Sequence, residues 1–381
     1  MGTVSVRPIS SKKDIRLFLE FPYELYRDEP NWVPPLRFEQ AARIDRRKNP
    51  GLHGIEFQLF LAEQDGEVVG RIAAIINQNH LAKHQDGAGH FGFFDARPGQ
   101  EIASALFGEA EAWLKARNMD KIVGPYSLSI YEEVGLLIDG FDTPPVVMMP
   151  HGRVDYQQTI ENLGFTKAID MTAWWANMHE GYPRPPVVDR MLAHIDKTPE
   201  IRVRPMRKGK FLEEVRLAME IFNDAWNENW GHVNLSDAQI KHMAGELKPL
   251  INRDFFWVCE YEGKPAAFIL MIPNVNEAIH DLDGKLLPFG WAKLLWRLKV
   301  KGLKTTRIPL MGVRKEYQRT RNGLAMAAFL SEKAFEMGRA HGYECVEMGW
   351  ILETNKSMIR IIEQAQGVAY KTYRMYEKPL A

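Results

Sequence analysis

The sequence has few cysteines, no long apolar run and no signal-like start. Its two cysteines, Cys259 and Cys345, each lie inside an apolar run, which predicts buried, reduced thiols and not a disulfide. No stretch approaches the ~18 apolar residues of a membrane-spanning helix, and the first residues lack the apolar core of a signal peptide. These absences predict a soluble, cytoplasmic protein.

Net charge is also absent, because 49 basic residues balance 49 acidic ones. No overall field therefore attracts nucleic acid, and we expect no nucleic-acid partner. His80 and His84 have the helical spacing of a metal-binding pair, and His90 is near. The stretch is loop-like, however, and lacks the glutamate of an H-E-x-x-H motif, so we predict no metal site.

What is present is an internal repeat. The tripeptide VRP occurs at residues 6–8 and again at 203–205, and an apolar hairpin pattern surrounds Gly66 and again Gly263. Both recurrences are shifted by 197 residues. Solenoid repeats are far shorter than this period, so the pattern indicates a duplicated domain.

Each half also has the same predicted order of elements: strand, helix, hairpin, strand, helix, strand, helix, strand. This order predicts an α/β fold with a mixed sheet in each half. We expect one domain over residues 1–180 and a second over 201–381. Residues 181–200 form the predicted linker, because their proline cluster disfavours regular structure before a short helix.

A basic loop in the second half carries the clearest binding signal. The segment GVRKEYQRTRNGLA (312–325) leads from a predicted strand into a predicted helix. Gly323 permits close approach of backbone N–H groups to a ligand, and the helix start carries partial positive charge. With Arg319 and Arg321, this pattern predicts a pyrophosphate site. The alternative is a solvated basic loop before an ordinary core helix.

This loop, the segment NKSMIRIIEQAQG (355–367) and the element order of both halves resemble the GCN5-related N-acetyltransferase (GNAT) superfamily. The resemblance implies a bacterial tandem protein with two GNAT-like domains, each a mixed, mostly antiparallel sheet flanked by helices. It implies direct transfer of an acyl group from acetyl-CoA, or another acyl-CoA, to the amine of a small molecule or peptide. The coenzyme-binding residues it implies are Met311, Gly312, Val313, Gln318, Arg319, Thr320, Arg321, Asn322, Gly323, Leu324, Ala325, Asn355 and Met358.

The matching region of the first half lacks these features. Residues 97–100 contain one glycine without a second small residue, and Asp95 and Glu101 flank the expected phosphate position. Carboxylates repel a pyrophosphate. We therefore expect the first domain to keep the fold with a degenerate cofactor site.

Three residues are candidates for proton transfer. Glu347 lies in the apolar strand pattern YECVEMGWI, where burial would raise its pKa and suit it as a general base. Glu353, just after this strand, is the second candidate base. The alternative is that Glu347 faces water at a sheet edge. The tyrosine with which the family protonates the leaving thiolate corresponds to Ile362, so Tyr373 on the last predicted strand is the candidate acid.

The region where the family places acceptor contacts is AWNENWGHVNLSD (225–237). Aromatic faces beside neutral polar groups suit a small-molecule or peptide pocket. The alternative is that these residues anchor a loop on the core. The predicted substrate-binding residues are Trp226, Asn229, Trp230 and His232.

Residues 288–304 combine apolar side chains with lysines and an arginine, which is typical of a basic amphipathic helix. Such a helix contacts a membrane surface peripherally, binds an acidic partner, covers an acyl chain, or simply packs against the sheet.

Two other functions compete with the predicted N-acyltransferase. One is a transferase with another acyl donor such as aminoacyl-tRNA, against which the neutral net charge counts. The other is a non-catalytic ligand-binding or scaffold protein. The missing tyrosine supports it, and so does Thr320, which stands where the family has glutamine or arginine.

Overall fold

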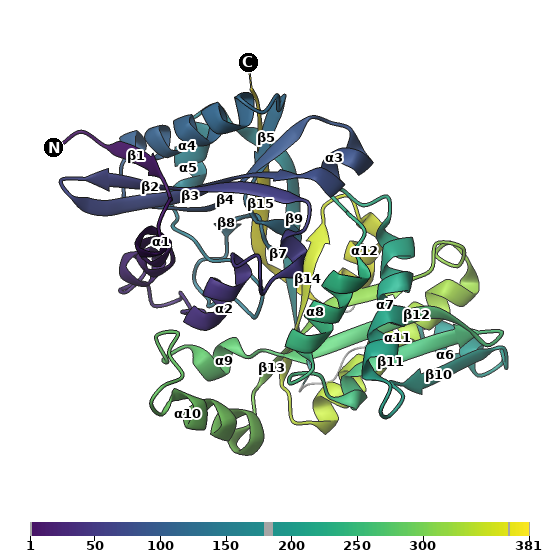
Figure 1. Ribbon diagram of the computed structural model, residues 1–381. Coiled ribbons are helices and arrows are strands. Elements are labelled where there is room, and N and C mark those ends of the chain that lie inside the picture. Colours follow the sequence, from purple (N-terminus) through teal and green to yellow (C-terminus); the bar gives the residue numbers. More distant parts are fainter. Residues whose placement is uncertain (1, 179–185, 365, 381) are drawn as a thin grey trace. The chain divides into compact units, whose positions relative to one another are not determined.

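The computed structural model describes residues 2–178, 186–364 and 366–380, which form two compact units (Figure 1). Unit 1 comprises Met1–Met171, Ile279–Ala292 and Lys371–Ala381; unit 2 comprises Thr172–Ala278 and Lys293–Tyr370. Neither unit is one continuous stretch of sequence, because each includes segments from both halves of the chain. Part of the expected linker, residues 181–185, lies outside the described residues, and the helix that follows it belongs to unit 2.

The sheet of unit 1 has the strand order β1-β2-β3-β4-β5-β15. Neighbouring strands are antiparallel except β4 and β5, which are parallel. Their bounds are β1 Ser5–Pro8, β2 Ile55–Gln64, β3 Glu67–Asn77, β4 Ala88–Ala96, β5 Lys121–Gly124 and β15 Val368–Pro379.

The sheet of unit 2 repeats this topology in the order β10-β11-β12-β13-β14-β9. β13 and β14 are parallel, as β4 and β5 are in unit 1, whereas β10, β11, β12 and β13 pair antiparallel in succession. The predicted mixed, mostly antiparallel sheets are therefore confirmed. The bounds are β10 Ile201–Pro205, β11 Phe256–Tyr261, β12 Lys264–Pro273, β13 Thr305–Val313, β14 Cys345–Leu352 and β9 Thr166–Asn177.

Both predicted hairpins are present, and their turns are alike. Asp65 and Gly66 have φ of 53° and 83°, and Glu262 and Gly263 have φ of 50° and 76°. Two consecutive positive φ values match the right-handed twist of paired strands, which explains the glycine in each turn.

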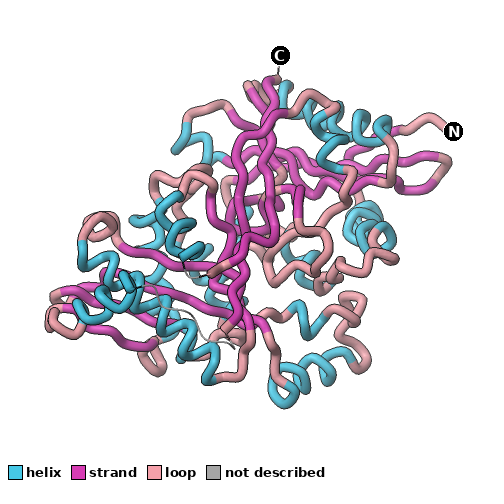
Figure 2. Tube along the Cα trace, turned by 180° about the vertical axis from the view of Figure 1, so that it is seen from behind, coloured by secondary structure: helices cyan, strands magenta, loops and turns pink. Residues whose placement is uncertain are grey.

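Alternating side chains place helices on both faces of each sheet (Figures 1 and 2). In unit 1, Phe60 and Ile72 share a buried cluster with α4 (Gln100–Lys115), whereas Leu61 and Ala73 share one with α1 (Lys12–Leu25). In unit 2, α11 (Arg321–Ala340) packs on β12, and α7 (Phe211–Trp226) contacts β12 and β13. The other elements are α2 Arg37–Arg43, η1 Pro50–Leu52, α3 Gln78–His84, β6 Tyr126–Ser127, β7 Ser129–Val134, β8 Leu136–Asp139, α5 Tyr156–Glu161, α6 Pro186–Ile195, α8 Asp237–Leu247, η2 Arg253–Phe255, α9 Asn276–Ile279, α10 Gly290–Trp296, η3 Arg297–Lys301 and α12 Lys356–Gln364.

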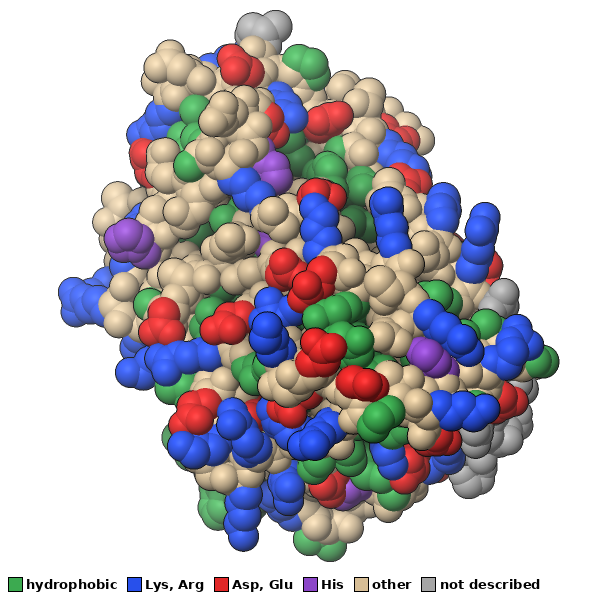
Figure 3. All heavy atoms as spheres, turned by 90° about the vertical axis from the view of Figure 1, so that its right-hand side faces the viewer, with side chains coloured by type: hydrophobic (Ala, Val, Ile, Leu, Met, Phe, Trp, Pro, Cys, Tyr) green, Lys and Arg blue, Asp and Glu red, His purple; other side chains and the backbone are tan. Residues whose placement is uncertain are grey.

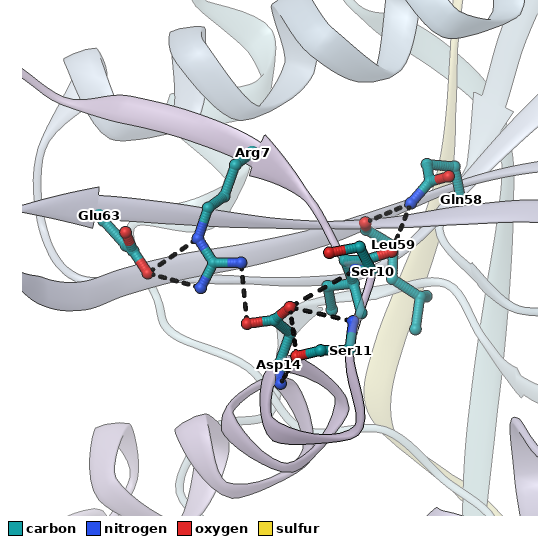
Figure 4. Close-up of polar contacts among 8 residues, drawn as sticks. Arg7, Ser10, Ser11, Asp14, Gln58, Leu59 and Glu63 are labelled. Carbon is teal, nitrogen blue, oxygen red and sulfur yellow. Dashed lines mark hydrogen bonds and ion pairs between the residues drawn. The ribbon is translucent and has the colours of Figure 1, made fainter.

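A serine before an apolar-periodic segment predicts a helix N-cap, and Ser11 is the N-cap of α1 (Figure 4). Ser11 Oγ accepts a hydrogen bond from the Asp14 amide, and the Asp14 carboxylate accepts one from the Ser11 amide. Arg7 on β1 pairs with Asp14 at 2.9 Å and with Glu63 on β2 at 2.8 Å. Side chains therefore tie α1 to β1 and β2. The Ser11 hydroxyl, assisted by Arg7, lowers the pKa of Asp14 to about 2.

Candidate active site

The centre of the candidate site is a place where two parallel strands part. β13 and β14 pair from Thr305–Cys345 to Ile308–Met348, and no further pair between them is formed in the described chain. β13 continues to Val313 with β12 on its other side, where Val313 pairs with Ala267. Backbone groups of residues 309–313 thus line a gap. Met311, Gly312 and Val313, three of the predicted coenzyme-binding residues, lie along it.

The end of α7 reaches this gap. Trp226 Nε1 donates a hydrogen bond to the Met311 carbonyl at 3.3 Å, and its ring centroid lies 6.2 Å from that of Trp350 on β14. Trp226 therefore contacts both strands where they separate. The resemblance anticipated Trp226 as a substrate residue; Trp350 was not anticipated.

A second predicted substrate residue joins this aromatic group. The Phe222 ring lies 4.9 Å from Trp226 and 5.5 Å from His232. His232 is buried, and its Nε2 lies 3.2 Å from Asn234 Oδ1, so it is not a surface histidine. The Asn229 amide donates to the Trp226 carbonyl, and its carbonyl accepts from the His232 amide. Trp230, the fourth predicted residue, is partly exposed in the same turn.

The basic loop after β13 is held by its own side chains. Gln318 Nε2 donates to the Val313 and Ala225 carbonyls at 3.0 and 3.1 Å. Thr320 is the N-cap of α11, and its Oγ1 accepts from the Gly323 amide at 3.1 Å. A Cβ added to Gly323 would lie 1.9 Å from the Tyr317 carbonyl oxygen. Close backbone packing therefore requires glycine here.

The same loop presents basic groups at the start of α11. Arg319 and Arg321 are exposed, and neither guanidinium forms an ion pair within the described part of the chain. Leu324 is also exposed, whereas Ala325 is buried in the core of unit 2, and Asn322 Oδ1 lies 2.7 Å from His194 Nε2. Two exposed arginines at a helix N-terminus fit the phosphates of a coenzyme.

The remaining predicted coenzyme residues lie at the start of α12. Asn355 Oδ1 accepts a hydrogen bond from the Met358 amide at 3.2 Å, so Asn355 caps this helix. Asn355 is exposed and Met358 partly so. Their coenzyme contacts remain predictions.

Glu347 does not face water. It is completely buried on β14, one residue before Met348, where the pairing of β13 and β14 ends. Its carboxylate accepts a hydrogen bond from the Tyr370 phenol and lies 3.2 Å from Arg307 Nε on β13. Arg307 Nη2 donates to the Gly349 carbonyl at 3.0 Å. The exposed alternative was wrong because β14 lies between β13 and β9, so neither of its edges is free.

Arg307 and Tyr370 were not anticipated as partners of Glu347. Arg307 faces Glu347 directly in the parallel register, which no spacing along the sequence reveals. Tyr373, the predicted acid, belongs to unit 1, is completely buried and pairs with Leu137 of β8. A role for Tyr373 stays a prediction.

In unit 1 the parallel strands also part, after His90 and Val123. The backbone of Tyr126 takes the corresponding place, since a Cβ on Gly92 would lie 1.5 Å from its carbonyl oxygen. Asp95, expected beside a phosphate position, is instead buried, accepting from the Tyr26 phenol at 2.6 Å and pairing with Arg71 at 2.7 Å. The close packing at Gly92 leaves little room for a thioester arm.

Unit 1 contains a cavity of about 650 Å³ with a different chemistry. Trp32 stacks on Tyr26 with ring centroids 5.3 Å apart and meets Tyr23 edge-on at 5.4 Å. Five carboxylates and three basic groups line it, an acidic balance that suits an organic cation better than a phosphate. The charged residues are Glu20, Glu24, Glu29, Asp281, Asp283, Arg27, Arg37 and Lys285.

No helix in the described ranges is long and apolar enough to cross a membrane. Nor do those ranges bring three or more His, Cys, Asp or Glu side chains together in a group that could hold a metal ion. Cys259 and Cys345 are free thiols; Cys259 is buried, which raises its pKa. On the face in Figure 3, acidic and basic side chains are interspersed.

Comparison with known proteins agrees with this geometry. The chain is 44% identical over 375 residues to protein YghO of Escherichia coli K12, covering 98% of this chain and 95% of the relative. It is 41% identical over 379 residues to a bacterial ceramide synthase of Caulobacter vibrioides, covering 99% and 98%. A solved tandem GNAT protein of clavulanic acid biosynthesis superposes with a TM-score of 0.58 at 11% identity, covering 99% of both chains. No family model matches the sequence.

The repeated mixed sheet with its parting parallel strands is the tandem GNAT fold. More particularly, the chain belongs to the bacterial family that includes YghO and the Caulobacter ceramide synthase, because both are similar along nearly its whole length.

Proposed function

We propose that this protein is an N-acyltransferase that moves a fatty acyl group from an acyl-CoA thioester to the amine of a long-chain amino alcohol. The observation that carries the proposal is the gap between β13 and β14 beside the basic start of α11. The acceptor class is supported by the 41% identity to a bacterial ceramide synthase, since a ceramide is an amide of such an amine.

In this mechanism the amine nitrogen attacks the thioester carbonyl, the C–N bond forms, and the C–S bond breaks. The oxyanion is stabilised by backbone N–H groups of residues 311–313, and Arg319 and Arg321 hold the coenzyme phosphates. The Trp226 and Trp350 rings line the place where the carbonyl would lie. The coenzyme A thiolate leaves and takes up a proton.

The amine must lose a proton, and Glu347 is the base that we propose. Tyr370 is partly exposed and donates to the buried carboxylate, so the pair offers a hydrogen-bonded route from the surface to Glu347. Arg307 stabilises the charged carboxylate between turnovers. We assign no step to Tyr373.

A long acyl chain would have to open an apolar region of unit 2. The pocket there, among α7, α8 and strands β11 to β13, is entirely apolar but has a volume of only about 10 Å³, roughly that of one water-sized sphere. Three methionines in this lining adapt their shape more readily than branched side chains do. The lining includes Met206, Met219, Met243, Leu247, Phe268 and Leu310.

The test compares the double variant Arg319→Glu, Arg321→Glu with the double variant Lys12→Glu, Lys13→Glu, which reverses two exposed charges on α1. Calorimetric titration with decanoyl-CoA and with acetyl-CoA measures binding, and release of free thiol in the presence of sphinganine measures turnover. We expect the loop variant alone to lose both.

Unchanged affinity in the loop variant would remove the phosphate site from this loop. Tighter binding of acetyl-CoA than of decanoyl-CoA would overturn the long-chain donor. Absence of thiol release with every acyl-CoA and amine tried would favour a non-catalytic ligand-binding protein.

A further inference from the structure

The connection between β12 and β13 exposes large apolar side chains on one short stretch. Leu287 is 80% exposed, Phe289 78% and Val300 71%. Trp291, Leu295 and Trp296 are each about half exposed. The alternative that this amphipathic segment buries its apolar side chains against the sheet is therefore wrong for these six residues. Soluble proteins seldom expose so many large apolar groups together without a binding partner.

This stretch is folded and anchored at its basic end. Residues 290–296 form α10 and residues 297–301 form η3. Arg297 is buried, and its Nη1 donates to the Ala278 carbonyl at 2.7 Å. The Lys304 and Thr305 amides both donate to the Glu277 carboxylate, at 2.9 and 2.8 Å. The backbone is thus fixed while the apolar side chains point outward.

The charge on this stretch has one sign. Residues 287–301 contain no aspartate or glutamate and four basic residues. Three of the four, Lys293, Lys299 and Lys301, are exposed among the apolar side chains. The neutral net charge of the whole chain conceals this local basic surface.

We propose that the docking segment, residues 287–301, binds the surface of an anionic lipid bilayer. Its Trp, Phe and Leu side chains enter the boundary between headgroups and acyl chains, where tryptophan is enriched in membrane proteins. Its exposed lysines lie at the lipid phosphates, each contributing attraction that salt screens. An acidic protein surface would also attract the lysines. The two tryptophans and the phenylalanine beside them favour an anionic bilayer instead, because aromatic side chains are enriched at the level of the headgroups.

This proposal does not rest on the acyl donor or the acceptor, since it uses only exposure, anchoring and charge. It does give the segment a use in the proposed reaction, because long-chain amines and acyl groups partition into membranes. The contact is interfacial: no described helix is suited to span a bilayer.

Cosedimentation of the full chain with vesicles tests the proposal, using phosphatidylcholine alone and phosphatidylcholine mixed with phosphatidylglycerol. One variant carries Leu287→Ser with Phe289→Ser, and another carries Lys293→Glu with Lys299→Glu. The matched controls are Val154→Ser with Val368→Ser, at sites 70% and 62% exposed, and Lys12→Glu with Lys13→Glu. Circular dichroism verifies that every variant is folded.

We expect wild type to bind the anionic vesicles and to be released by high salt. Each segment variant should bind them roughly tenfold or more weakly, and the controls should bind like wild type. Failure of wild type to bind, or equal binding by the segment variants, would overturn the proposal. Sedimentation that reveals a dimer abolished by Leu287→Ser with Phe289→Ser, without vesicle binding, would instead assign the segment to self-association.

Discussion

The Tyr370 phenol donates a hydrogen bond to the Glu347 carboxylate, which is completely buried in the strand beside the gap. Arg307 shares this carboxylate at 3.2 Å. Because this ion pair is buried, removal of one of its charges should strongly lower the free energy of unfolding. The first prediction follows from it.

Replacement Glu347→Gln should lower turnover by roughly 100-fold, because the amide cannot accept the amine proton. It should also lower stability by about 3–5 kcal/mol, since it leaves Arg307 buried without its counter-charge. Thiol-release kinetics against pH and thermal unfolding measure the two effects. The control is Glu344→Gln on the same stretch, where Glu344 pairs with the exposed Lys304. A folded Glu347→Gln enzyme with wild-type kcat would exclude Glu347 as the base.

A second prediction concerns the glycine at the start of α11. Gly323→Ala should weaken acyl-CoA binding by roughly tenfold or more, a change of about 1.4 kcal/mol, because its Cβ would displace the Tyr317 carbonyl and with it the loop. Gly245→Ala in α8 is the control, since its Cβ would meet no atom within 4 Å. That change should stabilise the helix by about 1 kcal/mol and leave binding unaltered. Equal affinities for all three proteins would contradict the placement of the coenzyme.

A third prediction follows from His90. Burial lowers the pKa of its side chain to about 3, and nearby His80 makes a smaller contribution. The unfolded chain has the ordinary pKa of about 6.5 and so takes up a proton first as pH falls. Stability is therefore complete above about pH 6.5 and declines toward pH 3, by about 2 kcal/mol at pH 5. Urea unfolding at pH 7 and pH 5 should show this loss shrink in His90→Gln and persist in the exposed-site variant His53→Gln. The same loss in both variants would be evidence against His90.

A fourth prediction concerns the cap of α1. Ser11→Ala removes the hydroxyl that accepts from the Asp14 amide, and it should destabilise unit 1 by about 1 kcal/mol. The adjacent Ser10→Ala should cost far less, since the side chain of Ser10 is exposed and does not cap the helix. Urea unfolding compares the two variants, and equal losses would mean that the hydroxyl is not the stabilising group.

Much of the fold could be predicted from the sequence because its signals are local. The turns at Gly66 and Gly263 need positive φ, and Ser11 precedes an apolar-periodic segment, so short stretches indicated these elements. The candidate coenzyme loop was equally local, since Thr320 and Gly323 lie three residues apart at the start of one helix.

The sequence by itself therefore determined the duplicated α/β fold and the basic loop before α11, because turn chemistry, side-chain alternation and helix capping act over a few residues. Only the tertiary structure decided which strands are neighbours: it paired β15 with β5, placed Arg307 opposite Glu347, and brought Trp226 to Met311. It also decided that Leu287 and Phe289 are exposed. These facts depend on strand register and on packing between residues far apart in the chain, which no local pattern encodes.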